Sequence, residues 1–462
     1  MAESWATLGV DLHLEPAGAG GLRRGLTDAL RDAVRTGRLA PGTRLPSSRT
    51  LADDLGIARN TVAEAYADLV AEGWLTARQG SGTRVAERAV VPPSGPARQP
   101  RVPARPTHNL VPGTPDLAAF PRAEWARAAR RALTAAPNEA LGYGDPRGRV
   151  ELRTALAGYL ARVRGVRADP DNLVVTAGFS HALRVLGQVL RARGVRSVAV
   201  ESYGLDVYWG LLQTAGLATP ALPWDELGTD TRALGTEGAV LLTPAHQFPM
   251  GMPLHHDRRA AVVDWARRND SLVLEDDYDG EFRYDRQPVG ALQGLDPDRV
   301  VYLGTASKSL APGIRLGWMV LPPALAEEVI GAKGHADTVG VLEQLTLAEF
   351  LASGAYDRQV RSARLRYRRR RDALTAAVAE RAPGVHVTGI AAGLHAVLRL
   401  PPGTEPSVIQ AAAWQGLALH GLSFHRHPEA RAEHVDALVV GYGTPPDSAW
   451  SAALEALCRA LP

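Results

Sequence analysis

The stretch Val300-Val301-Tyr302-Leu303-Gly304-Thr305-Ala306-Ser307-Lys308-Ser309 is the part of this 462-residue chain that most clearly decides its fold. Its apolar half predicts a buried strand, and its small residues predict a turn at the strand's carboxyl end, where α/β proteins place ligand chemistry. Lys308 is one of two lysines, the other being Lys333. A lysine, unlike an arginine, can become an amine nucleophile. Lys308 is therefore a candidate for covalent chemistry. The alternative is that Lys308 has no special role and is simply one of the few cationic positions at which this arginine-rich chain has lysine.

Four more apolar runs alternate with helical patterns along the chain. Runs that are apolar throughout are typical of strands buried on both faces, so we predict a doubly wound α/β body with a large parallel or mixed sheet. Polar groups that follow such strands gather at one edge of the sheet. From about Gln344 the sequence changes to long Arg/Ala helices and a smaller α+β subdomain. The four runs are Leu173–Thr176, Val198–Glu201, Val240–Thr243 and Leu272–Glu275.

Length and composition indicate two or three globular domains. Hydrophobic residues make up 45% and charged residues 22%, and the net charge is +3. The single cysteine, Cys458, excludes an internal disulfide framework and fits a reducing compartment. We find no signal-peptide pattern and no apolar run near the roughly 20 residues that span a bilayer. These features predict a cytoplasmic protein with no membrane partner.

A proline-rich segment separates a small module from a large body. Val91–Pro106 contains six prolines and three arginines, which is typical of an extended spacer. We predict a DNA-binding domain over residues 1–90, a Pro/Arg-rich linker over 91–108 and an effector domain over 109–462.

The small module has the pattern of a winged helix-turn-helix. Leu22, Leu26, Leu30 and Val34 recur at helical spacing, a second helix starts at Ser47 or Ser48, and a third runs from about Asn60 to Glu72. Trp74–Thr76 and Thr83–Val85 then flank a glycine-rich hairpin tip. A three-helix domain used only for dimerisation is the alternative.

DNA contacts in such a module concentrate at the start of the recognition helix and in the wing. Arginine reads guanine and asparagine reads adenine, which makes Arg59 and Asn60 the candidate specificity residues. Glycines in the wing would let the backbone approach phosphate. The full candidate DNA-binding set is Arg44, Ser48, Arg49, Arg59, Asn60, Thr61, Gly80 and Gly82.

The body has the parts needed to hold an aldehyde cofactor on a lysine. Such a site needs an acid for the pyridine nitrogen, a donor for the phenolic oxygen and a cradle for the phosphate. Asp276 and Tyr278 follow the strand at Leu272–Glu275 and point to the same side of an extended segment. Acid clusters also bind metals or face water, but no histidine at ligand spacing supports a metal here.

Two segments supply a candidate phosphate cradle. Gly178 and Phe179 lie where a strand turns into a helix, so backbone N–H groups and the helix dipole can hold an anion. Thr305, Ser307 and Arg315 bracket Lys308, and arginine suits a phosphate.

The two parts of the chain resemble known families. Leu39–Ala52, Arg59–Val62 and Leu69–Leu75 resemble the GntR family of bacterial transcription regulators. The body resembles fold type I pyridoxal-phosphate aminotransferases, and the combination is similar to the MocR subfamily of GntR regulators. The body's matching stretches are Leu110–Asp116, Gly142–Gly148, Thr243–Gly251, Glu275–Tyr284 and Tyr302–Gly317.

The resemblance implies a role for several residues. Lys308 would be the Schiff-base lysine for pyridoxal 5'-phosphate, Asp276 the pyridine partner and Arg315 a phosphate ligand. In a homodimer, Tyr143 would enter the neighbouring subunit's pocket. Tyr203 would stack on the cofactor ring, although Glu201-Ser202-Tyr203-Gly204 departs from the usual Glu-x-Pro-Gly-Tyr.

One departure concerns the arginine that holds a substrate carboxylate in aminotransferases. Asp436 or Ala437 falls where we expect it, and Arg426 or Arg431 are the possible substitutes. The resemblance therefore implies a regulator that binds operator DNA under control of pyridoxal phosphate, and not an enzyme. Its signal would be the cofactor itself, with vitamin B6 supply as the regulated process, or an amino compound that reacts with the bound cofactor. A working aminotransferase and a decayed pocket are the remaining alternatives.

The arginine-rich stretch from Arg358 to Arg371 has two readings. We favour a solvated or interdomain helix over a second nucleic-acid site.

Overall fold

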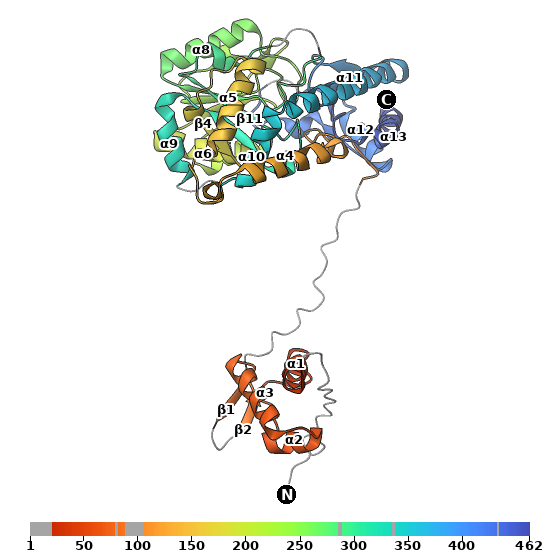
Figure 1. The fold of residues 1–462 in the computed structure, drawn as a ribbon. Helices are drawn as coiled ribbons and strands as arrows, with labels where there is room; N and C mark the ends of the chain where they lie inside the picture. Colours follow the sequence, from red (N-terminus) through yellow and green to blue (C-terminus); the bar gives the residue numbers. More distant parts are fainter. Residues whose placement is uncertain (1–20, 79–81, 88–105, 285–288, 335–337, 432–433) are drawn as a thin grey trace. The chain divides into compact units, whose positions relative to one another are not determined.

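The computed structural model in Figure 1 describes residues 21–78, 82–87, 106–284, 289–334, 338–431 and 434–462. Contacts between Cα atoms divide the chain into two compact units between residues 104 and 105. Gly80, one of the candidate DNA contacts, lies outside the described residues, as does most of the proline-rich segment.

The N-terminal unit contains three helices and a two-stranded antiparallel hairpin. The side chain of Ser47 accepts a hydrogen bond from the Thr50 backbone N–H at 3.1 Å, so Ser47 is the cap that starts the second helix. Gly56 ends that helix with φ of 65°. The predicted winged helix-turn-helix is present. Its elements are α1 (Leu22–Arg35), α2 (Ser48–Leu55), α3 (Arg59–Ala71), β1 (Leu75–Arg78) and β2 (Gly82–Val85).

The body is built on a seven-stranded sheet with the order β4-β12-β11-β10-β9-β5-β6. All five strands predicted from apolar runs are there, with ends that differ by at most two residues. Gly317–Val320, which we did not predict as a strand, pairs antiparallel with both neighbours and makes the sheet mixed. The strands are β4 (Leu173–Thr176), β5 (Val198–Glu201), β6 (Ala221–Leu222), β9 (Ala239–Leu242), β10 (Leu272–Asp276), β11 (Val300–Thr305) and β12 (Gly317–Val320).

Helices cover both faces of this sheet, which explains why its strands are apolar throughout. Leu272 and Leu274 of β10 belong to a core shared with α6, α7 and α9, whereas Val273 belongs to a core shared with α8 on the opposite face. Helices α4, α5 and α10 pack on this second face too. These helices are α4 (Arg122–Ala135), α5 (Val150–Arg164), α6 (Phe179–Ala192), α7 (Asp206–Thr214), α8 (His256–Asn269), α9 (Pro323–Lys333) and α10 (Val341–Ala352).

The C-terminal part is a smaller α+β subdomain, as predicted, around a four-stranded antiparallel sheet of order β13-β14-β17-β16. The long helix α11 (Ala355–Arg381) leads into it, as Figure 1 shows. The other elements of this subdomain are β13 (His386–Thr388), β14 (Ala396–Arg399), α12 (Glu405–Trp414), β16 (His420–Gly421), β17 (Ala437–Val440), α13 (Asp447–Ala460) and β15 (Leu417–Ala418), which pairs with β3 (His108–Asn109). Between β6 and β9 of the large sheet, β7 (Trp224–Asp225) and β8 (Gly228–Thr229) form a separate short pair.

Arginines of α11 contact both the large domain and the C-terminal subdomain. Arg370 is buried and pairs with Asp116 at 2.9 Å while donating to the Tyr442 and Pro445 carbonyls. Arg364 donates two hydrogen bonds to the Glu281 carbonyl. These contacts favour the interdomain reading of this helix.

Candidate functional site

A cavity lies at the carboxyl ends of the central strands, where the sequence placed the chemistry. Lys308 and most of the other predicted cofactor residues line it. Its described lining is Pro112, Gly113, Phe179, Ser180, Val200, Glu201, Tyr203, Gly204, Leu205, Tyr208, Trp209, Leu241, Thr243, Phe248, Asp276, Tyr278, Thr305, Ser307, Lys308, Pro312, Arg315, Leu394 and His395.

Lys308 is held with its amine inside the cavity. Its Nζ donates to the Gly113 carbonyl at 2.6 Å. Burial lowers the pKa of Lys308, and the nearby carboxylates of Asp276 and Asp279 oppose that shift. A lowered pKa makes the neutral, nucleophilic amine easier to reach.

Asp276 has a buried carboxyl, one oxygen of which has no hydrogen-bond partner among the described residues. It is 5% exposed, and its Oδ1 accepts no hydrogen bond from any described residue. Burial raises the pKa of Asp276 well above its usual value, opposed by the charge of Lys308. A cationic N–H donor placed against Oδ1 would relieve this cost, because a charge-assisted hydrogen bond stabilises a buried carboxylate. A protonated pyridine nitrogen is such a donor, so the site fits the predicted cofactor.

The start of α6 lies against Arg315. Gly178 has φ of +84° and precedes the helix, and a Cβ there would lie 3.1 Å from the Arg315 guanidinium. The Arg315 guanidinium donates to the Ala177 carbonyl. Thr305 donates from Oγ1 to Ser307 Oγ at 2.8 Å on the other wall. Backbone N–H groups, hydroxyls and a guanidinium together suit a phosphate.

The three candidate tyrosines differ in placement. Tyr278 and Tyr203 both line the cavity. Tyr143 is fully exposed and is not among the described residues of the lining, so any role in a pocket requires a second chain. Sequence reasoning missed Tyr208, His395 and Glu201. Glu201 could have been found from its position at the end of strand β5. Tyr208 lies in helix α7 and His395 directly precedes β14 in the C-terminal subdomain, so neither follows a strand of the large sheet.

Asp436 and Ala437, which occupy the position expected for a carboxylate-binding arginine, have structural roles in the C-terminal subdomain. Asp436 accepts from the backbone N–H groups of Gly403 and Glu405, at 3.1 and 3.0 Å, and so holds the start of α12. Ala437 is fully buried. Among the described residues that line the cavity, Arg315 is the only arginine; Arg431 lies outside the lining, and Arg426 is bridged to Tyr203, which belongs to it.

Asp277 serves the scaffold, although it neighbours Asp276 in the sequence. Its carboxylate pairs with Arg164 at 2.6 Å and accepts from the Tyr302 hydroxyl at 2.7 Å. Both members of the ion pair are at most 4% exposed. Successive side chains of an extended segment alternate, which sends Asp276 to the cavity and Asp277 to the opposite side.

We expect Asp277→Asn to lower the free energy of unfolding of the body by about 3–5 kcal/mol, because it removes the carboxylate that pairs directly with the buried Arg164 charge. The matched control is Asp357→Asn, which breaks an exposed pair with Arg162 and should cost about 0–1 kcal/mol. Denaturant unfolding of the full chain measures both. Equal effects of the two substitutions would contradict this assignment.

Some arginines of the N-terminal unit pair with carboxylates, whereas Arg24, Arg78, Arg84 and three of the candidate DNA contacts are exposed and pair with no carboxylate of the described residues. Arg23, Arg31, Arg35 and Arg38 pair with acidic side chains of α1 and α3. Arg44, Arg49 and Arg59 are exposed, and no carboxylate of the described residues lies within ion-pair distance of them. These three lie on the connector to α2, at the start of α2 and at the start of α3. Ser48, Asn60 and Thr61 lie at the same two helix starts, and Gly82 begins β2 close to the Arg44 side chain.

Comparison with known proteins matches both units to families. Residues 22–85 match the gntR family of bacterial regulatory proteins, and residues 109–425 match aminotransferase class I and II. The pyridoxine biosynthesis regulator PdxR of Corynebacterium glutamicum is 36% identical over 87% of this chain and 88% of its own. The probable rhizopine catabolism regulatory protein MocR of Rhizobium meliloti is 33% identical over 89% of both chains. The kynurenine aminotransferase of Pyrococcus horikoshii has a TM-score of 0.67 at 26% identity, covering 76% of this chain and 89% of its own.

A winged helix-turn-helix joined to an aminotransferase-like body defines a DNA-binding transcription regulator with an aminotransferase-like domain. No helix within the described residues is long and apolar enough to cross a membrane. The chain belongs to the GntR family of bacterial regulators, in its MocR subfamily.

Proposed function

We propose that this regulator binds pyridoxal 5'-phosphate covalently through Lys308 and that the cofactor controls binding of operator DNA. The single observation that carries the proposal is the unpartnered Oδ1 of Asp276, buried in the cavity that also holds the Lys308 amine. Burying a carboxyl without a hydrogen-bond partner costs free energy, and an apolar ligand would not offset that cost. The proposal rests on that chemistry together with the family.

Each group in the cavity then has one task. The cofactor supplies an aldehyde that forms a reversible bond with an amine. Lys308 provides that amine, Asp276 holds the pyridine proton, and Tyr278 donates towards the phenolic oxygen. Arg315, the start of α6 and the hydroxyls of Thr305 and Ser307 hold the phosphate. Tyr203 packs against the ring.

The nature of the signal follows from what the cavity lacks. Arg315 belongs to the phosphate cradle, which leaves no second described arginine in the lining for a substrate carboxylate. We therefore favour pyridoxal phosphate itself as the signal, with vitamin B6 supply as the regulated process, in keeping with the name of the PdxR relative. An amino compound that reacts with the bound cofactor is the alternative. Both versions make the body a sensor and not a transaminase.

The remaining parts of the proposal concern assembly. We propose a cytoplasmic homodimer in which Tyr143 completes the pocket of the second subunit. The proposed divisions are 1–90 for DNA binding, 91–108 for the linker and 109–462 for the effector domain. A ligand shifts the two DNA modules only if it binds one arrangement better than the other.

The test is operator affinity of the full chain with and without pyridoxal phosphate, on duplexes selected from random sequence by the protein itself. We expect affinity to change by about 5–150-fold, the usual range for coupling between sites. The titration is repeated with a panel of amines and amino acids on cofactor-loaded protein. A further change with one of them would make the amino compound the signal, and no response to the cofactor would reject the proposal.

A further inference from the structure

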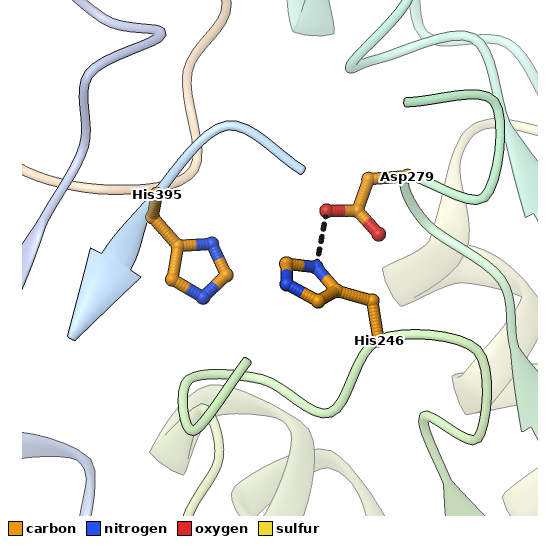
Figure 2. Close-up of side chains that lie close together, drawn as sticks. All are labelled: His246, Asp279 and His395. Atoms are coloured by element: carbon orange, nitrogen blue, oxygen red, sulfur yellow. Dashed lines mark hydrogen bonds and ion pairs between the residues drawn. The ribbon is translucent and has the colours of Figure 1, made fainter. Parts of the chain in front are cut away.

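Two buried histidines from distant parts of the sequence meet beside the cavity. His246 lies in the loop after β9 of the large domain, and His395 directly precedes β14 of the C-terminal subdomain. Their ring centroids are 5.1 Å apart, and both residues are at most 4% exposed. Figure 2 shows the His246 ring between the Asp279 carboxylate and the His395 ring. The proposed cofactor chemistry gives no task to either histidine.

Each ring is anchored through one of its two nitrogens. His246 Nδ1 lies 2.8 Å from Asp279 Oδ2, and because a carboxylate only accepts, this nitrogen carries the hydrogen. His395 donates from Nε2 to the Pro249 carbonyl at 3.0 Å. Burial lowers the pKa of His395 well below its usual value, and the charge of His246 adds to the shift, so the His395 ring is neutral. In the neutral rings, Nε2 of His246 and Nδ1 of His395 therefore bear lone pairs.

These two nitrogens have no hydrogen-bond partner within the part of the chain that the structure describes. The Tyr278 hydroxyl lies 3.1 Å from His246, but from Nδ1, the nitrogen that is already anchored. Figure 2 shows a nitrogen of each ring on the edge that faces the other ring. Gly251 adds no side chain beside this gap, where a Cβ would lie 3.6 Å from His246 Nε2. Two unshared lone pairs that face one gap can receive a cation.

The separation of the two rings suits a shared metal ion. A Zn–N bond of about 2.0–2.1 Å puts the centroid of an imidazole about 3.2 Å from the ion, so two rings at a tetrahedral angle have centroids about 5.2 Å apart. The observed separation of 5.1 Å agrees with this value. Ligand atoms of His246, His395 and Asp279 also lie within 4.8 Å of one another. The rings can therefore reach one ion with little rearrangement.

The surroundings of the pair are those of metal-binding histidines. A histidine that binds a metal almost always donates its other N–H to a carboxylate or a backbone carbonyl, which fixes its tautomer and ring orientation. His246 donates to a carboxylate and His395 to a carbonyl. The backbone is shaped around this arrangement, because Gly393 has φ of +72° and a Cβ there would lie 2.3 Å from the His246 ring and 2.5 Å from the Asp279 carboxylate. His395 lines the cavity, which gives an ion a path of entry.

We propose that His246 and His395 bind a divalent transition-metal ion through these two nitrogens, and that Asp279 orients His246 for it. Imidazole nitrogens favour Zn²⁺, Cu²⁺ or Ni²⁺, whereas Mg²⁺ and Ca²⁺ prefer oxygen, and water fills the remaining positions. The sequence showed no histidine at ligand spacing because each domain of the body supplies one ligand. The ion joins the two domains beside the cavity. The inference does not depend on the proposed function.

The test is Zn²⁺ binding by the untagged full-length chain, without pyridoxal phosphate so that free cofactor cannot chelate the ion. Equilibrium dialysis against ZnCl₂ followed by elemental analysis should show one high-affinity ion per chain, which excess Mg²⁺ does not displace. His246→Ala and His395→Ala should each weaken it by at least about 100-fold, because loss of a ligand costs more than loss of its outer partner. Asp279→Asn removes that outer partner and should weaken binding by about 10–100-fold. Zinc binding that ignores all three substitutions overturns the proposal.

The matched control is His256→Ala, because a second group of possible ligands lies at the surface. His255, His256 and Asp257 also place ligand atoms within 4.8 Å of one another, and the His256 side chain is 81% exposed. His256→Ala should leave the high-affinity ion in place. If it removes that ion while the variants of the buried pair keep it, zinc binds at the surface and the proposal fails.

Thermal unfolding guards against variants that lose the ion because they do not fold. A ligand that binds only the folded state raises the Tm as its concentration rises. The Tm of the body should therefore increase with Zn²⁺ in the wild-type and His256→Ala proteins. It should not respond in His395→Gln, which keeps most of the side-chain volume but offers no imidazole. An equal rise in His395→Gln overturns the proposal.

Discussion

Replacing Lys308 by alanine is expected to abolish the visible absorption band that forms when the protein is mixed with pyridoxal phosphate. The change removes the only amine among the described residues that line the cavity. The proposed phosphate-binding groups and Asp276 stay in place, so we expect the cofactor still to bind, but without a covalent bond to the protein. Covalent retention after borohydride reduction and desalting should fall from about one cofactor per chain to about none, since an amine is the only group here that forms a reducible bond with an aldehyde.

The chain supplies its own control, because it contains only one other lysine. Lys333 is buried at the end of α9, where its Nζ donates to the Pro146 carbonyl, and it is not part of the cavity lining. Lys333→Arg should keep the band and the reduced adduct. Peptide mass mapping after reduction should place the added mass on Lys308. A band that survives in Lys308→Ala but is lost in Lys333→Arg would move the site elsewhere.

Much of the body could be predicted from the sequence because its strands are buried on both faces. Five apolar runs therefore predicted five strands, and the polar residues that follow them predicted the edge of the sheet at which the cavity lies. Strand β12 (Gly317–Val320) was not predicted, because it follows an irregular turn and pairs antiparallel with its neighbours. Periodicity carries no information about pairing direction.

Only those cavity residues that lie within short continuous motifs could be predicted from the sequence. Asp276, Tyr278 and Lys308 lie in two short motifs, each attached to a strand end. His395 comes from the C-terminal subdomain, and nothing in Gly393-Leu394-His395 indicates that this segment meets the turn at Asp279. The sequence also did not show that Asp276 and its neighbour Asp277 have different roles. Asp276 and Asp277 are adjacent and identical in type, yet Asp276 lines the cavity with an oxygen that has no hydrogen-bond partner among the described residues, and Asp277 pairs with Arg164.

The N-terminal unit leads to the second large expected effect. Arg59→Ala and Arg49→Ala should each weaken binding to a selected operator by about 5–150-fold, corresponding to about 1–3 kcal/mol for a lost base or phosphate contact. Both side chains are exposed at helix starts and have no carboxylate partner among the described residues. A guanidinium without an internal counter-ion is free to bind the phosphate backbone or a base edge.

The matched control is Arg35→Ala in the same unit. Arg35 is also exposed, with 71% of its side chain open to solvent, but it pairs with Asp32 at 2.8 Å at the end of α1. Its loss should leave operator affinity nearly unchanged.

Salt dependence separates the two kinds of contact. Binding is measured by anisotropy at several salt concentrations on the selected duplex and on scrambled duplexes. A phosphate contact lowers affinity for every sequence and reduces the slope of log K against log salt by about one. A base contact relaxes discrimination at one position and leaves that slope alone. If Arg35→Ala weakens binding as much as Arg59→Ala does, the helix starts are not the DNA-reading surface, and net charge alone carries the affinity.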